Sequence, residues 1–168
     1  LERLMTLKGV VFADTQPRSM AGPVAFVPTA PARAAPAPAT TPDILTAIFD
    51  ARTAELLSWP TDIRGDWIPR PELDALRART RSAGVTALLG AAGSGKSALL
   101  AKLGAELQDD GVHVLALKAD RIPTEVETLA ALEAHLGLGG GTEACLRRLA
   151  ETGPVVVLVD QLDALSDI

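Results

Sequence analysis

The sequence predicts an α/β fold in which parallel strands alternate with helices. Three apolar runs, at residues 85–89, 112–118 and 155–159, are typical of strands buried on both faces of a sheet. Helical patterns separate these runs, and parallel strands need such crossover helices to return to the same edge. A glycine-rich stretch at residues 90–97 lies between the first strand and the helix that follows it.

Two helices are predicted ahead of the first strand. Thr41 is followed by a proline, which is tolerated in the first turn of a helix, so a helix is expected to begin there. Pro60 ends this helix. Pro71 opens a second helix that places Leu73 and Leu76 on one face.

The elements after the first strand follow from similar signals. Thr124 and Glu127 form a capping box, which predicts a helix that runs to about His135 and ends at Gly137. The other predicted elements are a helix over 95–107, a strand over 112–118, a helix over 142–151 and a strand over 155–159.

The segment before Thr41 has a different composition. Residues 17–42 carry seven of the 12 prolines, which predicts an extended linker that packs on nothing; a PxxP ligand for a partner domain is the alternative. The apolar run at 9–13 is interpreted as the end of an upstream region, residues 1–16. Both chain ends look cut, so we expect a fragment whose main domain, residues 43–168, is incomplete.

Composition limits the class of protein. The 168 residues are 48% hydrophobic and 3% aromatic, so the core is expected to consist of Leu, Val and Ala. A net charge of −5 argues against a nucleic-acid-binding surface. The single Cys145 allows no intrachain disulfide, which indicates a reducing, cytoplasmic location. No apolar run approaches the length of about 18 residues that a membrane helix needs, so we expect no membrane partner.

Residues 90–97, Gly-Ala-Ala-Gly-Ser-Gly-Lys-Ser, match the P-loop pattern G-x-x-x-x-G-K-[ST]. The glycines let backbone N–H groups surround phosphate oxygens at a helix N-terminus. Lys96 is expected at the β- and γ-phosphates, and the Ser97 hydroxyl is expected to ligate magnesium. A glycine-rich turn without a ligand is the alternative. The predicted nucleotide-binding residues of this stretch are Gly90, Gly93, Ser94, Gly95, Lys96, Ser97 and Ala98.

The third strand ends in a carboxylate, which is the Walker B pattern. Asp160 is expected to hold magnesium through its water shell, beside Ser97; an ordinary strand-terminal Asp is the alternative. Asp163 follows three positions later and either polarises a water or caps a helix. Asp160 and Asp163 are therefore the catalytic candidates.

Together these motifs resemble P-loop NTPases of the AAA+-related STAND class, which includes NACHT-type signalling ATPases. Residues 157–163 are similar to the extended Walker B of that class, in which a second acid follows the first by three positions. Gln161 stands where ordinary AAA+ proteins have Glu, and Ala164 stands where the class often has a further acid. Residues 67–73 resemble the segment that touches adenine, which implies contacts from Ile68 and Arg70, although Pro69 replaces a glycine.

The resemblance covers about residues 63–168 and implies three of the five strands of a P-loop NTPase core. It implies Mg²⁺ and ATP as cofactors, ATP or ADP as ligands, homo-oligomers of the full-length protein, and effector or ligand-sensing domains elsewhere. It also implies slow hydrolysis by the full-length protein and an inactive fragment. In this class a later strand separates the P-loop strand from the Walker B strand. Without it, we expect these two strands to pair directly; an empty slot is the alternative.

Two other functions remain open from the sequence: a P-loop kinase and an origin-recognition type AAA+ ATPase of DNA replication. Several further residues are expected to have no chemical role. Arg77, Arg79 and Arg81 are interpreted as a solvated helix face rather than a phosphate-facing patch. His113 and His135 have no partner at metal-ligand spacing.

Overall fold

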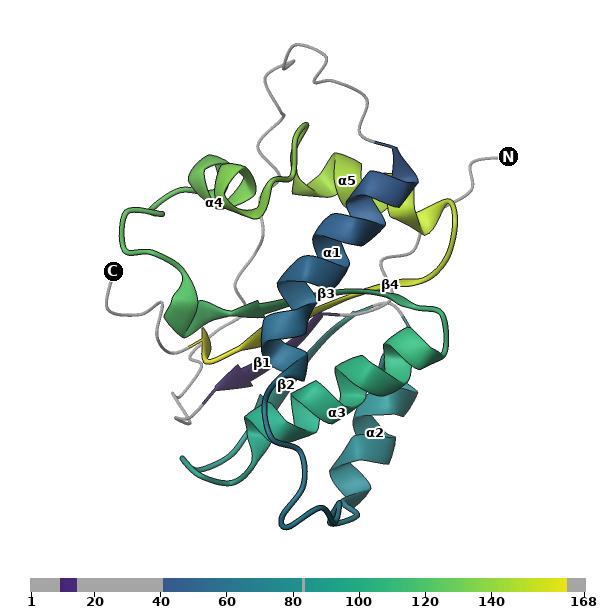
Figure 1. The fold of residues 1–168 in the computed structure, drawn as a ribbon, viewed down its shortest axis with the longest axis vertical. Helices are drawn as coiled ribbons and strands as arrows, with labels where there is room; N and C mark the ends of the chain where they lie inside the picture. Colours follow the sequence, from purple (N-terminus) through teal and green to yellow (C-terminus); the bar gives the residue numbers. More distant parts are fainter. Residues whose placement is uncertain (1–9, 15–40, 83, 163–168) are drawn as a thin grey trace.

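The computed structural model describes residues 10–14, 41–82 and 84–162, which form a mixed α/β fold around one parallel sheet (Figure 1). The strands are β1 (Val10–Asp14), β2 (Val85–Leu89), β3 (His113–Lys118) and β4 (Val155–Asp160). The helices are α1 (Pro42–Leu57), α2 (Pro71–Arg79), α3 (Lys96–Asp109), α4 (Leu129–Leu136) and α5 (Thr142–Ala150), with a short 3-10 helix at Ala119–Arg121.

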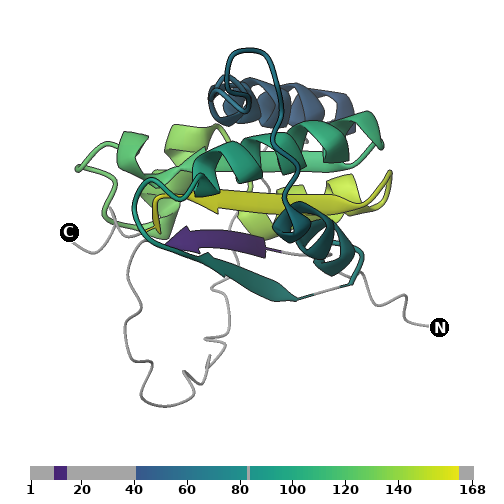
Figure 2. The same ribbon diagram turned by 90° about the horizontal axis from the view of Figure 1, so that it is seen from below.

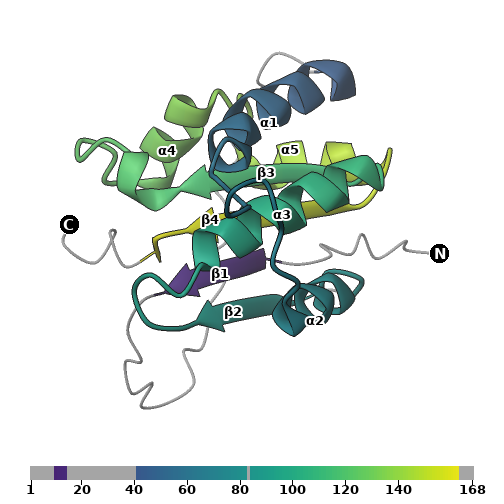
Figure 3. The same ribbon diagram turned by 60° about the horizontal axis from the view of Figure 1, so that its bottom comes forward.

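The strand order is β2-β1-β4-β3, and every neighbouring pair is parallel (Figure 3). The strand β1 lies between β2 and β4: Val10 is in register with Val85 on one side and with Val157 on the other. The expectation that β4 pairs directly on β2 is therefore wrong, and the slot between them is not empty. The apolar run assigned to an upstream region supplies a fourth strand, because a strand in this position satisfies backbone groups of both neighbours.

Helices cover the two faces of the β3–β4 half of the sheet (Figures 2 and 3). On one face, α2 and α3 pack on alternate residues of these strands, such as Val114 and Leu158. On the other face, α4, α5 and the first half of α1 pack on the intervening residues, such as Leu115 and Val155. This strict alternation is the period-2 pattern of a strand with two buried faces.

The free edge of β3 is closed by α1. The Thr53 hydroxyl donates a hydrogen bond of 2.6 Å to the Val114 carbonyl and accepts one of 3.0 Å from the Ala116 N–H. Thr53 is fully buried, so one side chain satisfies two backbone groups that an edge strand leaves open.

The outer strand β2 is less buried than predicted. Its bounds match the sequence prediction, but Val85 is 70% exposed and Leu89 is 59% exposed. The strand lies at the sheet edge, and its buried neighbours belong to the α2–α3 side alone, since only Leu88 packs against the core there. The expected cover on both faces holds for β3 and β4 and is wrong for β2.

The other element predictions have mixed outcomes. The helix starts at Thr41 and Pro71 are confirmed, and Leu73 and Leu76 are buried as expected. The prediction that a helix begins at Thr124 is wrong. The N-cap of α4 lies four residues later, where the Thr128 hydroxyl accepts a hydrogen bond from the Ala131 N–H. No helix in the described ranges is long and apolar enough to cross a membrane. The predicted linker lies almost wholly outside the described residues.

Candidate functional site

The glycine-rich loop, residues 90–97, joins the carboxyl end of β2 to the first turn of α3. Two of its glycines have a backbone geometry that favours glycine. Gly93 has φ +74° and Gly95 has φ +82°, values in the left-handed region that side chains disfavour. A Cβ on Gly95 would lie 2.8 Å from Arg70 Nη1, and a Cβ on Gly90 would lie 2.9 Å from Ser94 Oγ. The backbone conformation therefore disfavours side chains at Gly93 and Gly95, and a side chain at Gly90 would require the Ser94 hydroxyl to move.

Lys96 folds back over this loop. Its Nζ donates hydrogen bonds to the carbonyls of Gly90, at 2.9 Å, and of Ala91, at 3.0 Å. These two carbonyls hold the cation at the mouth of the loop. The role of Lys96 as the positive charge that meets a phosphate group stays a prediction.

The N-terminus of α3 has no side-chain cap. The N-caps of α1 and α4 accept a hydrogen bond from the helix through Thr41 and Thr128, whereas Gly95 offers no such group. The first N–H groups of a helix lack partners within it and carry the positive end of its dipole. Ser97 and Ala98 lie in this first turn, and the first intrahelical hydrogen bond is the one from the Leu99 N–H to the Gly95 carbonyl.

A cavity of about 370 Å³ joins the two sequence motifs. Asp160, at the end of β4, borders it opposite the glycine-rich loop. Trp59 and Gln161 complete its wall. The loop residues that line the cavity are Ala92, Gly93, Gly95, Lys96, Ser97 and Ala98. The structure thus brings together the loop and the strand-terminal carboxylate that the sequence predicts as one site.

Asp160 is paired with a residue that sequence reasoning missed. Lys118 ends β3 in register with Asp160, and its Nζ lies 3.4 Å from Asp160 Oδ2. The side chains are 3% and 1% exposed. The signal in the sequence was an opposite charge at the end of two apolar runs, which parallel strands in register place side by side.

Gln161 is a second residue that was not among the predicted site residues. It has φ +57°, which is uncommon for a residue with a side chain and costs about 1–3 kcal/mol. Its Oε1 accepts a hydrogen bond of 3.0 Å from Lys118 Nζ. The strained turn after β4 therefore aims a side chain at the Lys118–Asp160 pair and into the cavity wall.

The segment before α2 reaches the glycine-rich loop through Arg70. Its Nη1 donates a hydrogen bond of 2.7 Å to the Ser94 carbonyl, and its Nη2 lies 3.4 Å from Glu72 Oε1. A backbone hydrogen bond and the one from Arg70 lower the pKa of Glu72 below its ordinary value. Ile68 is 56% exposed and does not line the cavity. Of the two predicted adenine contacts, only Arg70 touches the loop, and Asp163 lies outside the described residues.

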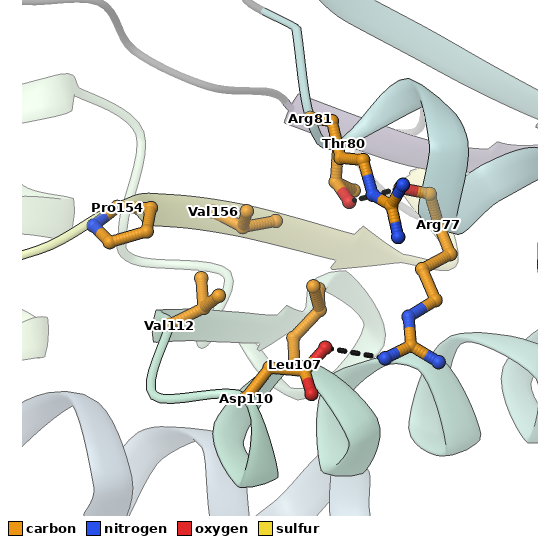
Figure 4. Close-up of a pocket in the computed structure, with 8 residues that line it drawn as sticks. All are labelled: Arg77, Thr80, Arg81, Leu107, Asp110, Val112, Pro154 and Val156. Carbon is orange, nitrogen blue, oxygen red and sulfur yellow. Dashed lines mark hydrogen bonds and ion pairs between the residues drawn. The ribbon is translucent and has the colours of Figure 1, made fainter.

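A smaller pocket of about 110 Å³ lies at the opposite, amino end of the strands (Figure 4). Arg77 borders it and is paired with Asp110 at 2.5 Å and with Glu106 at 3.5 Å. Val112 and Pro154, which precede β3 and β4, form its floor. Arg77 therefore lies at the other end of the sheet from the glycine-rich loop and is held by two acidic side chains.

The remaining titratable candidates are structural. His113 Nε2 is hydrogen-bonded to Thr152 Oγ1 at 2.9 Å, at the start of β3. Cys145, on α5, is buried in the core, and this burial raises the pKa of its thiol. Neither residue borders the cavity at the loop.

The donor set at the cavity suits Mg²⁺. One carboxylate, Asp160, and one hydroxyl, Ser97, are hard oxygen ligands, and Mg²⁺ in phosphate sites takes its other ligands from phosphate oxygens and water. Within the described ranges no cluster of three or more His, Cys, Asp or Glu side chains is arranged to hold a metal by itself. A metal here would therefore take most of its ligands from phosphate oxygens or water.

Comparison of the whole chain with protein-family models, with curated proteins and with solved structures found no match. The site is consequently characterised by its own geometry: a glycine-rich loop, an uncapped helix N-terminus and a buried Lys–Asp pair around one cavity.

Proposed function

We propose that this chain binds Mg-ATP through residues 90–97, with Ser97 and Asp160 as the magnesium ligands. One observation carries the proposal: the loop that matches the P-loop pattern and the strand-terminal Asp160 border the same cavity. Backbone N–H groups of the loop and of the first turn of α3 would receive the phosphates, and Lys96 would neutralise their charge.

The proposed role is that of an ATP-binding module in a cytoplasmic, STAND-like switch ATPase. In such a switch, nucleotide binding reorganises the core, and effector and sensor domains on the full-length protein read the change. Contact between Arg70 and the loop supports this version, since the segment that resembles the adenine-binding stretch meets the phosphate loop. Homo-oligomer formation and slow hydrolysis belong to the same proposal.

Calorimetric titration with ATP in the presence of Mg²⁺ tests the binding proposal. The parent chain should bind, and Lys96→Ala should abolish binding, because each charge-assisted hydrogen bond to phosphate contributes about 1.5–3 kcal/mol. Lys102→Ala is the matched control: Lys102 also lies on α3, but over the Trp67 ring at 5.9 Å, away from the cavity. Equal affinities of the parent and Lys96→Ala would rule the assignment out, and tighter GTP than ATP binding would reverse the base preference.

A further inference from the structure

The ammonium group of the buried Lys118 lies close to several partners besides Asp160. Lys118 Nζ lies 3.4 Å from Asp160 Oδ2, 3.6 Å from Asp120 Oδ1 and 3.0 Å from Gln161 Oε1. It also lies 4.6 Å from the centroid of the Trp59 ring, and Trp59 lines the same cavity as the glycine-rich loop. One ammonium group thus contacts the carboxylate of the candidate metal site and three alternative partners.

We propose that Lys118 is the internal counter-ion of Asp160 and competes with a divalent cation for that carboxylate. This inference rests on the proposed function, since it assigns a role to a residue beside the proposed magnesium ligand. In the metal-free protein Lys118 neutralises a carboxylate that is almost wholly buried. When a cation binds at Asp160, Lys118 withdraws to Asp120 and Gln161.

The alternative partners make this exchange feasible. Loss of the only acceptor of a buried lysine would leave an uncompensated charge, which is strongly destabilising. Lys118 keeps Gln161 and the carboxylate of Asp120, which is 31% exposed and only 0.2 Å farther from Nζ than that of Asp160. The two carboxylates lie on different elements, so a short movement of the lysine end changes which of them it neutralises.

The competition has a consequence for selectivity. A divalent cation that enters alone must displace a positive charge and remain close to it, which is unfavourable in a site of low dielectric. A cation that enters with phosphate groups brings negative charge of its own, so the repulsion is compensated. Lys118 therefore makes cation binding at Asp160 depend on nucleotide phosphate.

The test compares binding of Mn²⁺ alone, followed by the electron paramagnetic resonance signal of free Mn²⁺. Lys118→Met should bind Mn²⁺ at least about tenfold more tightly than the parent, because the competing charge is gone. Lys118→Arg keeps the charge and should bind as weakly as the parent. Lys102→Met is the matched control, since it also removes a lysine above a tryptophan, and it should leave Mn²⁺ binding unchanged. Asp160→Asn added to Lys118→Met should remove the gain.

Unchanged Mn²⁺ affinity of folded Lys118→Met would overturn the inference, because a merely structural ion pair leaves metal binding unaffected. This comparison contains no nucleotide, so its outcome is separate from that of the ATP titration. If ATP binds the parent and Lys118→Met shows no gain, the counter-ion role alone fails.

A second measurement does not depend on the folding of Lys118→Met. In a Trp67→Phe background, emission from Trp59 should change when Mg²⁺ and ATP are added together, because Lys118 leaves the indole face. Either component alone should produce less than half of that change. A full change with Mg²⁺ alone would contradict the competition.

Discussion

The guanidinium of Arg70 donates a hydrogen bond of 2.7 Å to the carbonyl oxygen of Ser94, which ties the segment before α2 to the glycine-rich loop. Among the described residues, no other side chain from outside α3 makes a hydrogen bond to the loop, and Arg70 also approaches Gly95 at the point where a Cβ would lie. Arg70 therefore helps to fix the conformation that the loop presents to a ligand.

Arg70→Ala should weaken ATP binding about threefold to tenfold, because one hydrogen bond that holds the loop, with a typical net value of about 1 kcal/mol, is lost. Calorimetric titration measures the affinity. Arg147→Ala is the control, since Arg147 pairs with Glu143 on the exposed surface of α5. An equal loss in both variants would show that the Arg70 contact does not support the site.

Gly95→Ala should abolish ATP binding while the chain remains folded. The new Cβ would lie 2.8 Å from Arg70 Nη1, and φ of +82° disfavours any side chain. Gly111→Ala is a matched comparison, because Gly111 has φ +77° but nothing within 4 Å of the added Cβ. It should lose about 1 kcal/mol of stability and no affinity. Retained ATP binding by Gly95→Ala would contradict the role of the loop.

Thr53→Val should lower the free energy of unfolding by about 1–3 kcal/mol, as measured in urea. The substitution keeps the volume but leaves the Val114 carbonyl and the Ala116 N–H of β3 without their buried partner. Thr124→Val, at an exposed position, is the control and should change stability by less than about 0.5 kcal/mol. A small effect at Thr53 would mean that water or another group reaches the edge of β3.

Phe12→Pro should destabilise the fold by about 1–3 kcal/mol or more, since β1 lies between two strands and proline removes a ladder N–H. Urea unfolding measures the loss, and slow amide exchange at Val11 in the parent would support the same pairing. The same change at Ala30, in the predicted linker, should be neutral. Equal stability of parent and Phe12→Pro would remove β1 from the sheet.

Local signals in the sequence predicted the elements that depend on local chemistry. The strand Val85–Leu89 has its predicted bounds, and Thr41 caps α1, because apolar runs and capping residues act over a few positions. Two threonines competed for the start of α4. The helix begins at Thr128 and not at Thr124, and it places Leu136 in the core. A capping pattern carries no information about which residues will be buried.

The relationships that the sequence did not reveal are those between distant segments. Nothing local indicates that Val10 pairs with both Val85 and Val157, since any apolar run has the same pairing groups. The Lys118–Asp160 pair follows from the register of β3 on β4. Gln161 has its positive φ directly after β4, and its side chain accepts a hydrogen bond from Lys118 on the neighbouring strand. The glycine-rich loop of the candidate site was therefore predictable from a local motif, whereas the Lys118 contact depends on how distant strands pair.

The position of β1 also affects the order in which the chain can fold. The central strand β1 must wait for β4, the last of the four described strands to be synthesised, before both of its ladders can form. Such non-local pairing gives a high contact order, which slows folding and exposes unpaired edges in the meantime. During synthesis on the ribosome the helix pair α2–α3 can form early, but the strand ends that carry the loop and Asp160 reach their final spacing only after β4 has been synthesised. Assembly of the site and completion of the sheet would then be a single kinetic event.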